Sequence, residues 1–121
     1  MNIEDLHNYC LQKRGVSESF PFDEDTLVFK VMNRMFTLTS LSNWEKGEAT
    51  INLKCEPGKA RSLRERYTAI TPGYHMNKKH WNTVHIDGTL SDDFLKEMID
   101  DSYQLIVKSL PKKAQKELES L

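Results

Sequence analysis

The residues best suited to chemistry lie in one stretch, TPGYHMNKKHWNTV, at residues 71–84. The side chains that could meet a ligand are Tyr74, His75, Lys78, Lys79, His80 and Trp81. Ammonium groups neutralise phosphates and exposed rings stack on bases or sugars, so cations interleaved with aromatic residues are typical of nucleic-acid binding. We therefore expect Lys78 and Lys79 to contact DNA phosphates, with His80 and Trp81 at the groove or stacked on bases.

The same stretch is compatible with three other interpretations. In the simplest, Tyr74 and Trp81 pack inward and the lysines are merely solvated. In the second, Tyr74, His75 and Trp81 line a pocket for a small molecule, such as an anionic metabolite, or for a protein partner. In the third, His75 or His80 acts as the general base of an enzyme. The chain has no GxSxG, Walker, GxGxxG or HExxH motif to name a reaction, so we predict a non-enzymatic binding protein.

Metal ligands and reactive thiols are not indicated by the spacing of histidines and cysteines. His75, His80 and His85 are five residues apart, which matches neither a helical face nor the usual zinc-site separations. The only two cysteines, Cys10 and Cys55, stand among apolar residues and outside any CxxC pair. The sequence predicts no metal, no cofactor and no disulfide.

Charge is segregated along the 121 residues, although the net charge is only −1. Residues 1–53 and 86–121 each carry a net −3, whereas residues 54–85 carry a net +5. Such asymmetry suggests an anionic partner, and an even mixing of charges on the folded surface is the alternative. Lys54, Arg61 and Arg64 belong to the basic segment, and we add them to the predicted phosphate contacts. Arg61 can also pair with Glu65 on a helix.

The elements that must position these residues follow from hydrophobic spacing and breakers. Asn2 caps a first helix that ends with Gly15 at its C′ position, and residues 26–40 form a hairpin turning at Asn33-Arg34. That turn pairs Val31 with Phe36 and Phe29 with Leu38, on one face of the sheet. Residues 16–22 are extended, 23–25 form an acidic turn, and 42–48 are expected to be a loop.

The second half alternates short strands with helices. Residues 49–55 and 81–86 alternate like strands, 59–67 form a short helix, and 68–71 are extended before a type II turn at Pro72-Gly73. Ser91 caps a long apolar-faced helix that Pro111 ends, and residues 112–121 form a terminal helix. This order predicts a single α+β domain over residues 1–121, an antiparallel sheet flanked by the N- and C-terminal helices.

Anchoring and secretion signals are not found. No apolar run reaches the 18–20 residues of a membrane span, and the acidic start lacks the basic region of a signal peptide. We expect a soluble cytoplasmic monomer.

Several runs of the chain resemble the MmcQ/YjbR family of small bacterial proteins. These runs are PFDEDTLVFKV (21–31), INLKCEP (51–57), LRERY (63–67), TPGYHMNKKHWNTV (71–84) and DDSYQLIVKSLPKK (100–113). The resemblance implies a frataxin/CyaY-like fold, described in this family as a double wing from which DNA binding is proposed. It places the family motif on Lys54, Tyr74, His75, Lys78, Lys79, His80 and Trp81, and brings no catalytic residues. Glu4 and Asp5 are too few for the acidic ridge of frataxin-like iron binders.

Overall fold

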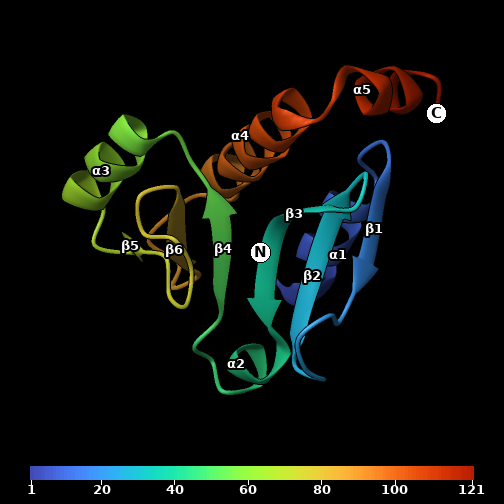
Figure 1. Ribbon diagram of the computed structural model, residues 1–121. Coiled ribbons are helices and arrows are strands. Elements are labelled where there is room, and N and C mark those ends of the chain that lie inside the picture. Colours follow the sequence, from blue (N-terminus) through green and yellow to red (C-terminus); the bar gives the residue numbers. More distant parts are fainter.

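A six-stranded antiparallel sheet, in the order β1-β2-β3-β4-β6-β5, runs across the molecule (Figure 1). The computed structural model describes all of residues 1–121. The strands are β1 (Val16–Ser19), β2 (Thr26–Val31), β3 (Arg34–Ser40), β4 (Thr50–Lys54), β5 (Ile70–Pro72) and β6 (Trp81–His85). The helices are α1 (Ile3–Leu11), α2 (Leu41–Glu45), α3 (Pro57–Arg66), α4 (Asp92–Ser109) and α5 (Lys112–Glu119). The predicted α+β class is confirmed.

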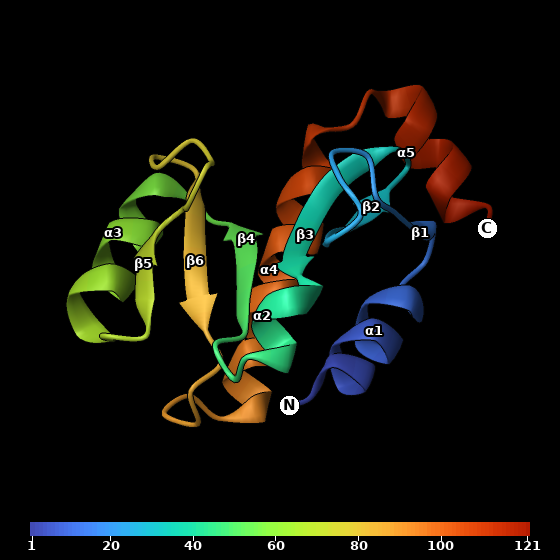
Figure 2. The same cartoon turned by 90° about the horizontal axis from the view of Figure 1, so that it is seen from below.

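The two faces of the sheet have different neighbours. Helices α1 and α4 lie on one face, behind the strands in Figure 1, and enclose a large apolar core with them. Seen from below, α3 lies beside β5 and β6 at one end, and α5 lies at the other end (Figure 2). The opposite face carries a small apolar cluster of Val28, Leu38 and Trp81, onto which the β5–β6 loop folds through Met76. No helix has the length and apolar character needed to cross a membrane.

The β2–β3 hairpin turns one residue earlier than predicted, and β3 contains a bulge that was not predicted. The turn is formed by Met32 and Asn33, both at positive φ (49° and 69°), as two-residue hairpin turns of type I′ require. Further along, Phe29 pairs with Thr37 and not with Leu38, and Phe36 is the extra residue of a β-bulge. The bulge leaves both Phe36 and Thr37 on the helix-covered face and moves Leu38 to the opposite face. The predicted common face of Phe29 and Leu38 is therefore wrong.

Four local predictions also differ from the structure at segment ends. Helix α1 ends at Leu11, so Gly15 is not its C′ residue, although it has a positive φ of 73° in the turn before β1. Residues 41–45, which overlap the predicted loop at 42–48, form α2; the Ser40 side chain accepts the Asn43 N–H, and the Asp25 carboxylate accepts hydrogen bonds from the backbone and hydroxyl of Ser42. Helix α3 begins at Pro57, two residues before the predicted start at residue 59, since proline suits the first helical turn. The type II turn expected at Pro72-Gly73 is absent, because Gly73 does not have a positive φ.

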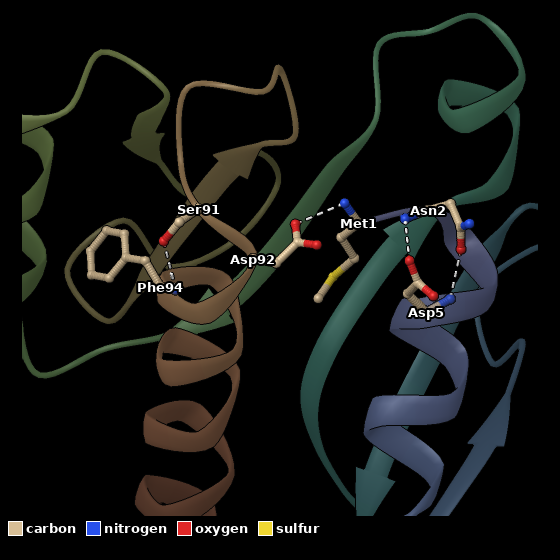
Figure 3. A network of polar contacts seen from close by, with 6 residues as sticks. All are labelled: Met1, Asn2, Asp5, Ser91, Asp92 and Phe94. Atoms are coloured by element: carbon tan, nitrogen blue, oxygen red, sulfur yellow. Dashed lines mark hydrogen bonds and ion pairs between the residues drawn. The ribbon is translucent and has the colours of Figure 1, made fainter.

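The N-termini of α1 and α4 are each capped by a side chain, and an ion pair joins the two (Figure 3). The Asn2 side chain accepts the Asp5 N–H at 2.8 Å, and the Asp5 carboxylate accepts the Asn2 N–H at 3.1 Å, which completes a capping box. The Met1 ammonium group lies 2.8 Å from the Asp92 carboxylate in the first turn of α4. Ser91 caps α4 as predicted, by accepting the Phe94 N–H.

One buried hydroxyl joins α4 to the centre of the sheet. Strands β3 and β4 pair from Thr39 to Thr37, and the next pair in this register would be Phe36 with Lys54. At that position the Ser102 Oγ donates to the Phe36 carbonyl at 2.6 Å and accepts the Lys54 N–H at 2.9 Å. Ser102 is fully buried, and its hydroxyl satisfies both backbone groups just beyond the last β3–β4 pair.

Replacing this hydroxyl should leave two buried backbone groups unpaired. We expect Ser102→Ala to lower the free energy of unfolding by about 1–3 kcal/mol, measured by urea unfolding. Ser109→Ala, at an exposed position of the same helix, is the matched control and should change it by less than about 0.5 kcal/mol. Equal effects of the two substitutions would contradict the bridging role of Ser102.

Candidate nucleic-acid interface

The loop between β5 and β6, residues 73–80, is closed by short backbone and side-chain bonds. The Gly73 N–H donates to the Trp81 carbonyl at 2.9 Å, and the Lys78 Nζ donates to the Gly73 carbonyl at 2.8 Å. A Cβ on Gly73 would lie 2.9 Å from the Trp81 Cβ and 3.0 Å from the Trp81 carbonyl oxygen. Gly73 is thus required for close approach of the two ends of the loop.

Arg64 connects α3 to this loop and to β6. Its Nε donates to the Asn82 Oδ1 at 2.6 Å, and its Nη2 donates to the carbonyls of Lys78 and Trp81. The Asn82 amide in turn donates to the Ala60 carbonyl of α3 at 3.4 Å. The guanidinium group was predicted to contact phosphate, but most of its donors are engaged within the protein. Arg64 therefore acts mainly by positioning the loop, while its positive charge remains.

Lys54 lies at the same end of the sheet as the loop. It is the last residue of β4 and pairs with Trp81 of β6. The next residue, Cys55, donates its N–H to the His80 carbonyl at 2.8 Å. Lys54 and His80 are half-buried, whereas Lys78, Lys79 and Arg61 are exposed. The structure thus brings the predicted basic residues of β4, α3 and the loop to one end of the sheet.

The cations at this end are largely free of carboxylate partners. The four ion pairs of the structure are Met1–Asp92, His7–Glu18, Lys13–Asp100 and Lys59–Asp101. Only the last of these lies in the basic segment, and it neutralises Lys59. The expected Arg61–Glu65 pair is not among the four. Lys54, Arg61, Lys78 and Lys79 therefore each keep an unpaired positive charge.

Trp81 does not have the exposure that its predicted role needs. It is only 9% exposed and packs with Val28 and Leu38 beneath Met76. A base needs an open ring face for stacking, so the prediction that Trp81 stacks on bases is wrong. The alternation of residues 81–86 predicts which face of the sheet the Trp81 ring lies on. It does not predict that Met76 covers the ring, because that depends on the path of the β5–β6 loop.

Tyr74 and His75 are the exposed rings of the loop. Tyr74 is 67% exposed, and the two ring centroids are 4.0 Å apart. His75 has a φ of 57°, a left-handed conformation that is uncommon for residues other than glycine. Both residues line a depression on the sheet face, whereas Trp81, which the pocket alternative also included, does not line it. Phe22 and Asn52 also line it, and the sequence interpretation did not include them.

The histidines and the two cysteines form no cluster of potential metal ligands and no disulfide. His75, His80 and His85 belong to no group of three or more potential metal ligands. Both cysteines are free and buried. Burial raises the pKa of the Cys10 thiol to about 12, and it also raises the pKa of Cys55. Neither thiol is activated as a nucleophile at neutral pH.

The positioning role of Arg64 can be separated from its charge. We expect Arg64→Ala to lower the free energy of unfolding by about 1–2 kcal/mol, because three acceptors lose a charged donor. Arg61→Ala removes the same charge from an exposed site and should change it by less than about 0.5 kcal/mol. Urea unfolding measures both, and equal stabilities of the two variants would contradict the positioning role.

Comparison with known proteins identifies the family. The YjbR family profile matches residues 11–105. The chain is 39% identical to protein YbdF of Escherichia coli O157:H7, over 96% of each chain, and 33% identical to protein YjbR of E. coli K12 over the whole of both. A crystal structure of Deinococcus radiodurans protein DR2400 superimposes with a TM-score of 0.90 at 39% identity, over 98% of this chain and 88% of that one. The chain belongs to the YjbR family, as its sequence motifs indicated.

Proposed function

We propose that this protein binds DNA through phosphate contacts made by the basic end of the sheet. The observation that carries the proposal is the placement of Lys54, Arg61, Lys78 and Lys79 on elements that meet at one end of the sheet, where none of the four pairs with a carboxylate. They come from β4, α3 and the β5–β6 loop, three segments separated in the sequence. Unpaired ammonium and guanidinium groups on neighbouring elements suit contacts with a phosphate backbone.

The surface is preorganised for such contacts. Arg64 ties α3 to the loop, and the Lys78 ammonium group is oriented by the Gly73 carbonyl while keeping donors free. The nearby Glu56 carboxylate is occupied in capping α3: it accepts the Gly58 and Lys59 N–H groups, and these bonds lower its pKa. The acidic group therefore serves the helix and forms no ion pair with the four cations.

The proposed contacts are to the backbone of DNA and carry little sequence information. The bases would have to be read by exposed side chains aimed into a groove, and the predicted aromatic reader, Trp81, is buried. We therefore propose salt-sensitive binding of duplex DNA with weak sequence preference. The proposal includes no catalytic step.

The salt dependence of affinity tests this proposal. Four phosphate contacts predict that a log–log plot of affinity against salt concentration has a slope of about −3.6 for duplex DNA. Fluorescence anisotropy with a labelled duplex of random sequence, repeated at several salt concentrations, measures the slope. Binding that is independent of salt would contradict phosphate contacts.

Charge reversal locates the contacts. Lys78→Glu combined with Lys79→Glu should weaken duplex binding at least tenfold and make the salt slope shallower by about two. Lys112→Glu with Lys113→Glu, an exposed pair at the start of α5, changes the net charge equally and is the matched control. A similar loss of affinity in both double variants would contradict the proposed surface and indicate a response to net charge alone.

A further inference from the structure

A depression of about 490 Å³ lies on the sheet face that α1 and α4 leave uncovered. It is lined by the β1–β2 loop, the ends of β3 and β4, the start of α2 and the β5–β6 loop. None of its lining residues is a lysine or arginine, so it is chemically different from the basic end of the sheet. The lining residues that matter here are Phe22, Asp23, Asp25, Leu38, Asn43, Thr50, Asn52, Tyr74 and His75.

Two exposed aromatic rings lie at this depression. Phe22 is 64% exposed and Tyr74 is 67% exposed, and they are two of only four large apolar side chains left substantially exposed. Phe22 precedes β2 and Tyr74 follows β5, so the rings reach the depression from strands on either side of β3 and β4. The His75 ring leans on Tyr74 from a left-handed backbone position. Exposed rings from two loops provide stacking surfaces for a flat ligand.

Between the rings, the lining combines one apolar side chain with neutral polar groups. Leu38 is buried in the cluster beneath the loop. The Asn52 Oδ1 accepts the Thr83 hydroxyl at 2.5 Å, and its amide nitrogen lies 3.5 Å from the Tyr74 carbonyl, so this amide is held in one orientation. The side chains of Asn43 and Thr50 form no hydrogen bond within the protein. They are free to donate to, or accept from, the edge of a ligand.

Charge at the depression disfavours anionic ligands. Hydrogen bonds from the Thr26 and Asp25 backbone lower the pKa of Asp23, and those from the Ser40 hydroxyl and the Ser42 backbone lower the pKa of Asp25. Both carboxylates are therefore ionised at neutral pH, with no lysine or arginine in the lining to offset them. An anionic metabolite, which the sequence interpretation considered, does not suit this charge.

We propose that the depression binds an uncharged, planar heteroaromatic ring with hydrogen-bonding edges, of the nucleobase class, stacked against Phe22 and Tyr74. Asn43 and Thr50 contact the ring edge. The ring can belong to a free nucleoside or to an unpaired base of a single strand, and the chemistry of recognition is the same. The site shares the β5–β6 loop with the basic end, but its nucleoside binding does not depend on the proposed DNA binding.

The test is a titration of the full chain with adenosine, guanosine, cytidine and uridine to millimolar concentration, followed by amide chemical shifts in NMR. At least one nucleoside should shift residues around 22–25, 50–52 and 74–76. Tyr74→Ala and Phe22→Ala should each weaken its binding about tenfold or more. Phe20→Ala removes an exposed ring of the same loop that lines a different depression, and it should leave binding unchanged.

The outcomes distinguish the two ring sources and the two proposals. A short single-stranded oligonucleotide whose binding weakens in Tyr74→Ala identifies an unpaired base as ligand, whereas shifts by nucleosides alone identify a free compound. The variant with Arg61→Glu and Lys79→Glu keeps the Lys78 bond that closes the loop and should still bind the nucleoside, so a failure of DNA binding leaves this site intact. No shift by any of the four nucleosides, shifts located elsewhere, or equal binding by the Phe20, Phe22 and Tyr74 variants would overturn the proposal.

Discussion

The hydroxyl of Ser102 is the contact on which the arrangement of this sheet depends. The β3–β4 pairing ends at Thr37 and Leu53, and beyond it the Ser102 Oγ bridges the Phe36 carbonyl and the Lys54 N–H. One side chain of α4 thereby bonds to both β3 and β4, at the end of β4 where Lys54 lies. The backbone of Lys54 is fixed because its N–H donates to the buried Ser102 hydroxyl, and this fixes the point from which the Lys54 side chain extends.

The position of the β5–β6 loop depends on Arg64. Arg64 uses its donors to hold the loop against α3, and the loop then presents two kinds of surface. Its second half carries Lys78 and Lys79 toward the basic end, and its first half carries Tyr74 and His75 over the sheet. A positively charged surface and a ring-lined depression that holds two carboxylates are therefore adjacent on one loop and have opposite electrostatic preferences.

Much of this architecture could be predicted from local sequence, because caps and alternation act over short distances. Asn2 and Ser91 correctly predicted the starts of α1 and α4, and the alternation of Ile51 and Leu53 correctly predicted the buried face of β4. The bulge at Phe36 could not be predicted, because the extra residue is stabilised by packing of α4. The burial of Trp81 and the engagement of Arg64 also depend on contacts across the sheet. The place of Phe22 in the depression could not be predicted either, because the β1–β2 and β5–β6 loops that line it are far apart in the sequence.

The central claim is that the basic end of the sheet is a phosphate-binding surface. The most direct measurement is an NMR titration of the full chain with a short DNA duplex at low salt, read at each backbone amide. We expect shifts that cluster on Lys54, Arg61 and residues 77–80, while α1 and α5 remain unchanged. Shifts that are absent, or that spread evenly over both ends of the molecule, would contradict it.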